Sequence, residues 1–288
     1  MSLNSPTITP VNLHLSIMRP LQFTKKKIKQ LFYALYQKRL ERAASQWQIP
    51  YHIGIILDGN RRYAKTEGFF DAAKRQYGHS EGGDKLEEVL HWCDELGVKI
   101  VSIWICSLDN FTNREEDEVE EIFNVIETKM RSLLTIEGLH TNQIKVRPMG
   151  ELELLPPSLQ EAIRDVEEAT KNYDKFILNV AVAYGGREEI VEAFRRHLKS
   201  ELAEGKGPDE ISAELSADKI TAHLYTSNLP DPDLIIRTSG EIRLSGFMLW
   251  QSAYSEYYFC DTYWPGFRKI DFLRAIRDYS HRERRFGR

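Results

Sequence analysis

The chain has 288 residues, of which 42% are hydrophobic and 28% charged, which is enough apolar material for one substantial core. Its net charge of −4 argues against a nucleic-acid-binding protein, which would carry a basic surface. No run approaches the roughly 20 apolar residues of a transmembrane helix, and the N-terminus lacks the pattern of a signal peptide. We therefore expect a soluble, cytoplasmic protein. The three cysteines are far apart and show no CxxC spacing, which predicts buried thiols rather than disulfides or a zinc site.

The first 50 residues differ in character from the rest. Residues 1–22 are rich in Pro, Ser, Thr and Asn and are predicted to be a disordered extension. Within residues 23–50, apolar side chains recur at helical spacing and lysines occupy the other face, which predicts a basic amphipathic helix. Such a helix either packs on its own domain or contacts an anionic membrane surface, here through residues 23–46. Residues 51–288 are predicted to form a single domain.

After Pro50 the pattern alternates between short apolar runs and amphipathic segments. The runs predict strands at residues 52–58, 99–106, 144–149, 176–184, 234–237 and 257–260. The segments predict helices at residues 82–96, 115–134, 156–172, 188–204, 217–225 and 270–285, with a loop at 205–208. This order indicates an α/β fold with a parallel sheet covered on both faces. In such sheets, ligands bind beyond the carboxyl ends of the strands.

Polar motifs follow four of these strands. DGNRR begins at Asp58, SLDNF at Ser107, GGR at Gly185 and RTSGEIRLS at Arg237. Arginine is suited to bidentate phosphate recognition, glycine lets backbone amides approach phosphate oxygens, and Asp58 could hold a hard cation. Each motif alone has a plainer explanation as a turn, a solvated face or a structural ion pair. Their coincidence favours a phosphate-ester site. Nucleotide loops of the GxxxxGK[ST] and GxGxxG types are absent.

Four segments resemble a known family. HIGIILDGNRRYA at 52–64 resembles the opening signature of cis-prenyltransferases, the undecaprenyl diphosphate synthase family. The blocks at 179–191, 236–267 and 282–287 resemble further segments of that family in the same order. The resemblance implies a mainly parallel six-stranded sheet flanked by helices, a hydrophobic tunnel, a homodimer and dependence on Mg²⁺.

The resemblance also implies roles for individual residues. Asp58 would hold the metal ion and assist departure of the allylic diphosphate, and Asn110 would help to remove the proton that sets the new double bond. Glu256 would be a second carboxylate near the metal. The residues implied in binding the allylic diphosphate and its chain are Gly59, Asn60, Arg61, Arg62, Tyr63, Arg75, His79, Ser107, Leu108, Asp109, Phe111 and Arg114. Those implied in binding isopentenyl diphosphate are Arg237, Arg243, Leu244 and Ser245.

Product length depends on the tunnel. Tyr63, Trp104, Ile105, Phe111 and Leu134 are candidates for its lining, although each could equally be ordinary core. Ile105 stands where long-chain members of the family carry a small residue, so its branched side chain is expected to shorten the tunnel. This chain therefore resembles the short-chain Z,E-farnesyl diphosphate synthases, and we expect a product of roughly C15 from geranyl and isopentenyl diphosphates.

Other functions remain open at this stage. A long-chain polyprenyl diphosphate synthase would use the same motifs. An irregular member could join two allylic units, because the Asn110–Arg114 spacing is one residue longer than usual. A catalytically inactive binding subunit is disfavoured because Asp58 and the phosphate-binding arginines are retained. A Rossmann oxidoreductase is disfavoured because its glycine fingerprint is absent.

Overall fold

The computed structural model describes residues 31–66 and 72–282, with the side chains of residues 72–80, 112 and 113 left aside. Its centre is one six-stranded sheet in the order β3-β4-β2-β1-β5-β6, and every neighbouring pair is parallel. The strands are β1 (His52–Ile56), β2 (Ile100–Trp104), β3 (Ile144–Met149), β4 (Phe176–Ala181), β5 (Leu234–Arg237) and β6 (Glu256–Phe259). The prediction of a parallel six-stranded sheet is confirmed.

The register of the central strands sets the position of the candidate site. Every residue of β1 and β2 is buried, as expected for strands covered on both faces. Ile56, the last residue of β1, pairs with Trp104 of β2 on one side and with Arg237 of β5 on the other. The segments that follow these three strands therefore leave the sheet at the same edge.

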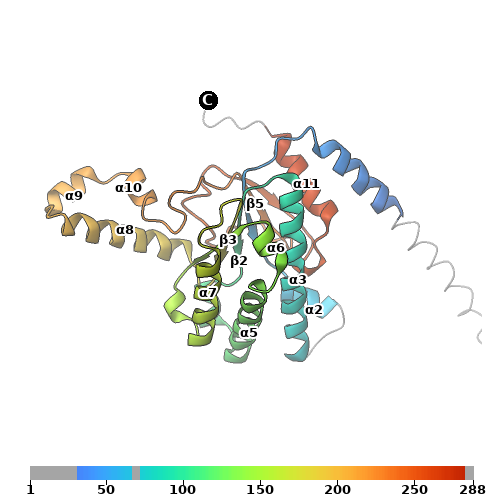
Figure 1. Ribbon diagram of the computed structural model, residues 1–288, viewed down its shortest axis with the longest axis horizontal. Coiled ribbons are helices and arrows are strands. Elements are labelled where there is room, and N and C mark those ends of the chain that lie inside the picture. Colours follow the sequence, from blue (N-terminus) through green and yellow to red (C-terminus); the bar gives the residue numbers. More distant parts are fainter. Residues whose placement is uncertain (1–30, 67–71, 283–288) are drawn as a thin grey trace, which may run out of the picture.

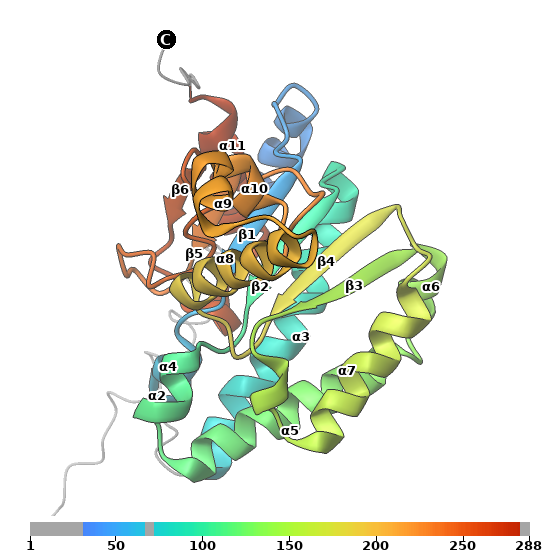
Figure 2. The ribbon, with the colours of Figure 1, turned by 90° about the vertical axis from the view of Figure 1, so that its left-hand side faces the viewer.

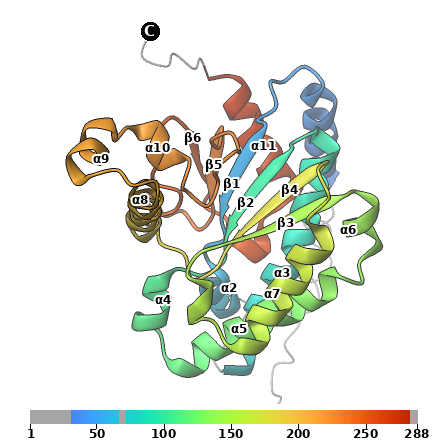
Figure 3. The same ribbon diagram turned by 60° about the vertical axis from the view of Figure 1, so that its left-hand side comes forward.

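Helices lie on both faces of the sheet (Figure 3). The main core joins the sheet to α3 (Ala72–Leu96), α5 (Glu116–Leu133), α7 (Pro157–Thr170) and α11 (Lys269–Ser280). A second core on the opposite face packs Trp104 and Tyr184 against Phe247 and Met248. Figure 3 shows α3, α5 and α7 on one side of the sheet and α8 (Gly186–Ala203) on the other. In Figure 1, α8 projects from the body and carries α9 (Pro208–Glu214) and α10 (Ala217–Thr221) as an arm.

Several elements differ from the sequence-based expectation. Helix α3 begins at residue 72, ten residues earlier than predicted, because its first turns lack an apolar stripe. The short helices α2 (Asn60–Thr66), α4 (Leu108–Asn113) and α6 (Glu137–Thr141) were not predicted, and α9 begins within the predicted loop at 205–208. Two 3-10 turns, Leu152–Leu154 and Trp264–Gly266, complete the fold. Figure 2 shows α2 and α4 together at one end of the sheet.

The N-terminal helix is described over residues 31–44, and the rest of the predicted 23–50 segment before it lies outside the described residues. Leu40 packs on Ile270 and Leu273 of α11, while Tyr33 and Tyr36 add to the same contact. The helix therefore uses one face to pack on its own domain. No helix in the part of the chain that the structure describes is long and apolar enough to cross a membrane. The three cysteines are buried free thiols, as predicted.

Candidate active site

Asp58 lies between two arginines at the carboxyl edge of the sheet. Its Oδ2 accepts a hydrogen bond from Arg237 Nη2 at 2.8 Å, and its Oδ1 accepts one from Arg62 Nη2 at 3.1 Å. Arg237 ends β5 and is 4% exposed, whereas Arg62 follows Asp58 by one turn of α2. Burial would raise the pKa of Asp58, but the hydrogen bonds and positive charges of the two guanidiniums outweigh it and hold that pKa below its usual value.

The segment after β5 wraps around the same two arginines. Arg62 donates to Glu241 Oε1 and to Ser239 Oγ, both at 2.8 Å, and Arg237 donates to Ser245 Oγ at 2.8 Å. Glu241 also pairs with Arg243, and the Arg243 carbonyl accepts from Arg237. We refer to Asp58, Arg62, Arg237, Glu241 and Arg243 as the arginine cluster. The structure thus brings together two of the four motifs that were predicted to share one site, those that begin at Asp58 and Arg237.

Backbone geometry explains the glycine of the DGN motif. Gly59 has a φ of +108°, which favours glycine, and a Cβ at this position would lie 2.7 Å from Cδ1 of Tyr263. The Tyr263 ring in turn lies beneath Arg62, with 5.5 Å between the guanidinium carbon and the ring centroid. A side chain at position 59 would therefore disturb the support of Arg62. Asn60 follows Gly59 and lines the cavity described below.

A second group of charges comes from the segment after β2. Glu118 at the start of α5 is 5% exposed, and it accepts from Arg114 Nη1 at 2.9 Å and from Arg61 Nη1 at 3.4 Å. Two predicted phosphate-binding arginines are thus held by a carboxylate that the sequence-based interpretation missed. In the sequence, Glu118 stands out only as an acidic residue one helical turn after Arg114. Acidic residues are common in the first turn of a helix, so this position did not indicate a role in the site.

The remaining predicted residues of this segment have clear positions. Ser107 and Asn110 hydrogen-bond to each other through their side chains. The Leu108 amide donates to the Tyr184 carbonyl at 3.3 Å, and Asp109 lies in the first turn of α4. Phe111 packs edge-to-face on Phe123 with ring centroids 5.2 Å apart.

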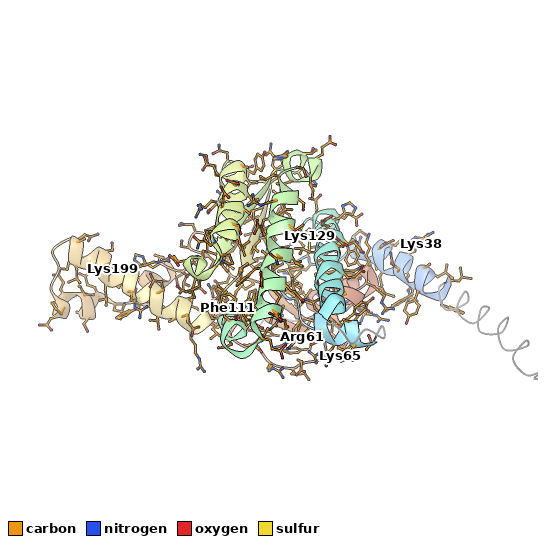
Figure 4. All side chains as sticks on the ribbon, turned by 90° about the horizontal axis from the view of Figure 1, so that it is seen from below. Lys38, Arg61, Lys65, Phe111, Lys129 and Lys199 are labelled. Atoms are coloured by element: carbon orange, nitrogen blue, oxygen red, sulfur yellow. The ribbon has the colours of Figure 1, made fainter. Side chains whose placement is uncertain are left out.

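An apolar cavity of about 550 Å³ opens from the arginine cluster and extends between the sheet, α3 and α5. Its polar end contains Asp58, Arg61, Arg62 and Lys65. Figure 4 shows Arg61 and Lys65 close together on this side of the molecule. The apolar lining consists of Leu57, Leu86, Leu90, Ile103, Ile105, Ile122, Val125, Ile126, Met130, Leu133, Leu178, Val180 and Trp264.

Of the five predicted tunnel residues, Ile105 alone is among the residues that line this cavity. Trp104 points to the opposite face of the sheet and stacks on Phe247, because successive side chains of a strand alternate between faces. Phe111 packs elsewhere, as described above. Tyr63 lies against Gly266, and Leu133 rather than Leu134 lines the cavity, because the two consecutive residues leave the end of α5 in different directions. For these four residues the structure therefore favours the alternative of ordinary packing.

Glu256 does not join Asp58 within one chain. Glu256 is the first residue of β6, whereas Phe259, three residues later, is the one that pairs with Arg237. Glu256 therefore lies roughly 10 Å along the strand from the level of Arg237. Its carboxylate pairs with Arg282 at 2.6 Å. Leu244 is half-buried next to Arg243 in the segment after β5. Arg75 and His79 belong to α3, but their side chains lie outside the described residues.

The site defines a class of protein before any comparison. Guanidiniums and a carboxylate at the mouth of an apolar cavity suit a ligand with an anionic, phosphate-bearing head and a hydrocarbon tail. Residues 56–287 match the family model described as putative undecaprenyl diphosphate synthase. The chain belongs to this family of prenyltransferases.

Named relatives span different products. The chain is 50% identical to the (2Z,6E)-farnesyl diphosphate synthase of Thermobifida fusca, covering 88% of this chain and 96% of that one. It is 46% identical to the tritrans,polycis-undecaprenyl-diphosphate synthase (geranylgeranyl-diphosphate specific) of Methanocaldococcus jannaschii, covering 88% of each. It is also similar to the crystal structure of lavandulyl diphosphate synthase from Lavandula x intermedia in complex with dimethylallyl diphosphate. That match has a TM-score of 0.74 and 34% identity, and covers 83% of this chain and 99% of the other.

Proposed function

We propose that this prenyltransferase condenses isopentenyl diphosphate with an allylic prenyl diphosphate, geranyl diphosphate in the first instance, and releases diphosphate. The observation that carries the proposal is the arginine cluster at the mouth of the apolar cavity, where Arg62 and Arg237 flank Asp58. A guanidinium pair recognises diphosphate oxygens, and an apolar cavity accepts the prenyl chain.

The allylic diphosphate would bind at the polar end of the cavity. Arg61 and Arg62 would contact its oxygens, together with the backbone amides of Gly59 and Asn60, and Arg114 would approach from the other side. In the free protein, carboxylates hold these arginines, so the guanidiniums are ordered before substrate arrives. Fixed positive charge at the leaving group lowers the barrier to its departure.

The donor set at Asp58 fits a magnesium ion. Mg²⁺ is usually held by one or two carboxylates together with substrate phosphates and water, so a single half-buried carboxylate next to a diphosphate site is sufficient. Both Asp58 oxygens accept from guanidiniums, and each oxygen has a second lone pair. When bound, the ion would neutralise charge on the departing diphosphate.

Isopentenyl diphosphate would bind on Arg237, Arg243 and Ser245. Arg237 donates a hydrogen bond to Ser245 Oγ, so its guanidinium already points to the place where a phosphate oxygen would accept a hydrogen bond. Asn110 would orient the proton that is lost when the new double bond forms. Because an amide is a weak base, a diphosphate oxygen would accept that proton.

Ile105 supports a short product, because its branched side chain contributes to the wall of the cavity. A long-chain product is the main alternative. Joining two allylic units is a second, suggested by the likeness to lavandulyl diphosphate synthase.

Product analysis tests these alternatives. Purified protein is supplied with Mg²⁺, isopentenyl diphosphate and primers of C5 to C20, and the dephosphorylated products are separated by chromatography. We expect a main product of C15 from the C10 primer. Chains of C50 to C55 would refute the short-product assignment, and product formed from dimethylallyl diphosphate alone would favour the irregular reaction. Asp58→Ala should abolish turnover, and Ile105→Ala should lengthen the product.

We further propose that the protein acts as a cytoplasmic homodimer. Val191, Phe194 and Leu202 form an apolar stripe along α8 and are 48%, 38% and 55% exposed, which a second copy would cover. Buried free thiols fit a reducing compartment. Sedimentation analysis should give a dimer for the natural protein and a smaller species for Phe194→Asp. A natural protein that sediments as a monomer would refute the dimer.

A peripheral membrane contact through residues 23–46 remains a separate proposal. Leu31, Phe32 and Leu35 are exposed on the N-terminal helix. Lys38, which Figure 4 shows on the same helix, follows Leu31 and Leu35 at helical spacing. An apolar patch beside cations suits an anionic lipid surface. Co-sedimentation with anionic vesicles, lost in neutral vesicles and in Phe32→Glu, would support the contact.

A further inference from the structure

The side chain of Lys129 spans the gap between two helices beside the cavity. Lys129 is on α5, and its Nζ pairs with Asp84 Oδ1 at 2.5 Å and with Glu87 Oε1 at 3.2 Å, both on α3. Figure 4 shows Lys129 on the side of α5 that faces α3. Lys129 and Glu87 both line the cavity, although the lysine side chain is also 30% exposed to solvent.

The methylene stem of this lysine lies directly over a glycine. A Cβ added to Gly83 would be 2.8 Å from Cε of Lys129 and 3.4 to 3.5 Å from its Cγ and Cδ. Gly83 and the preceding Gly82 lie inside a 25-residue helix, where each glycine is unfavourable relative to alanine. Because Gly83 has no side chain, the methylene groups of Lys129 can lie directly against the backbone of α3.

The wall at this point therefore differs from the rest of the cavity. Away from the polar end, the lining includes side chains such as Ile103, Ile126 and Leu178 that belong to the packed core. Beside Gly83 the lining includes the aliphatic part of a single lysine whose partners, Asp84 and Glu87, are 62% and 51% exposed. Exposed ion pairs hold a side chain weakly, and a lysine stem covers apolar surface while its ammonium stays in water.

We propose that Lys129 is a specificity-determining residue, and that its methylene stem over Gly83 forms the outer side wall of the prenyl-chain cavity. The inference rests on the proposed function, since it assigns a part of the wall that the prenyl tail would meet. Shortening this side chain opens the cavity between α3 and α5, so that longer allylic primers and longer products fit.

The experiment compares three variants with the natural protein. Lys129→Ala removes the stem, Lys129→Met keeps an unbranched apolar stem without the ammonium, and Lys171→Ala removes an exposed lysine paired with Glu168 on the distant α7. Each protein is first checked by circular dichroism and thermal unfolding. Affinities for unreactive C10, C15 and C20 thiolodiphosphates are measured by calorimetry, and products are analysed by chromatography.

Lys129→Ala should reduce the preference for the C10 over the C20 analogue about tenfold and should lengthen the main product by one or two C5 units. Lys129→Met and Lys171→Ala should keep the preference for the C10 over the C20 analogue within twofold of that of the natural protein. A Lys129→Ala variant with unchanged preference overturns the proposal, as does a Lys129→Met variant that behaves like Lys129→Ala. If the natural protein binds no analogue and forms no product, the proposed function itself fails. That outcome is distinct from an active protein whose selectivity does not depend on Lys129.

Discussion

Replacing Asp58 with asparagine tests how the arginine cluster is held together. The substitution keeps the shape of the side chain but removes the charge that Arg62 and Arg237 share. An amide offers one acceptor oxygen, so one of the two guanidiniums would face an NH₂ group instead of an oxygen. Arg237 is the more sensitive partner, because its side chain is 5% exposed.

The expected loss of stability follows from these contacts. A hydrogen bond to a charged group contributes about 1.5 to 3 kcal/mol, and the substitution removes at least one such bond from a half-buried site. We expect the free energy of unfolding to fall by about 2 kcal/mol. For a domain of this size, that corresponds to a decrease in Tm of roughly 4 to 8 °C, so the variant is still folded at room temperature.

The pH dependence gives the sharper test. The pKa of Asp58 in the folded protein lies below its ordinary value of 3.8, so the unfolded chain takes up the proton first as pH falls. The stability that Asp58 contributes is therefore complete well above pH 4 and is lost as pH falls through the folded pKa. Asparagine does not titrate, so the difference between the two proteins should shrink over the same range.

Chemical unfolding of both proteins from pH 7 to pH 3 measures this difference. Asp174→Asn, in the exposed turn before β4, serves as the matched control and should change stability little at any pH. Equal stability of Asp58→Asn and the natural protein at pH 7 would refute the view that Asp58 holds the two arginines. A difference that persists unchanged to pH 3 would refute the assignment of the pKa.

Three further substitutions test other parts of the site. Gly59→Ala should lower stability by about 1 to 3 kcal/mol in thermal unfolding, and by more than Gly205→Ala, whose positive φ is similar but whose surroundings are open. Equal losses would show that the close approach of Tyr263 is unimportant. Glu118→Gln should raise the KM for the allylic diphosphate about tenfold in steady-state kinetics, because the substitution weakens the hold of residue 118 on Arg61 and Arg114. An unchanged KM would contradict this role of Glu118. Arg237→Lys should raise the KM for isopentenyl diphosphate at least tenfold, since a lysine ammonium cannot reproduce the contacts that the guanidinium makes with Ser245 and Asp58 at the same time. An unchanged KM would mean that isopentenyl diphosphate binds elsewhere.

The sequence was sufficient to predict the sheet and the edge that carries the site. Strands such as β1 and β2 are short, apolar and buried throughout, so their pattern has few alternative interpretations. Once the strands are parallel, the residues after β1 and β5 must meet at one edge. The convergence of Asp58 and Arg237 was therefore predictable from topology.

The elements that the sequence did not predict have physical reasons in common. Helix α2 is seven residues long and buries only Ala64, so it has no apolar stripe to recognise. Glu118 and Glu241 were missed because each also contacts an arginine distant in the sequence, Arg61 at 57 positions and Arg62 at 179. Glu256 was placed near the metal by resemblance, but in this chain it lies at the start of its strand, away from the site edge.

The same reasoning explains why product length is hard to predict from one position. Ile103 of β2 and Ile105, which directly follows that strand, belong to one wall of the cavity, and their shared orientation follows from the alternation of side chains along the chain. The opposite wall belongs to α3 and α5, whose separation depends on how closely two helix surfaces approach. At Gly83 the space between the two helices is filled by the side chain of Lys129 from α5. The size of the cavity therefore depends on Gly83 and Lys129, which are 46 positions apart in the sequence. A long-chain synthase could therefore share Ile105 and differ at this pair, so product length has to be predicted from both walls of the cavity rather than from Ile105 alone.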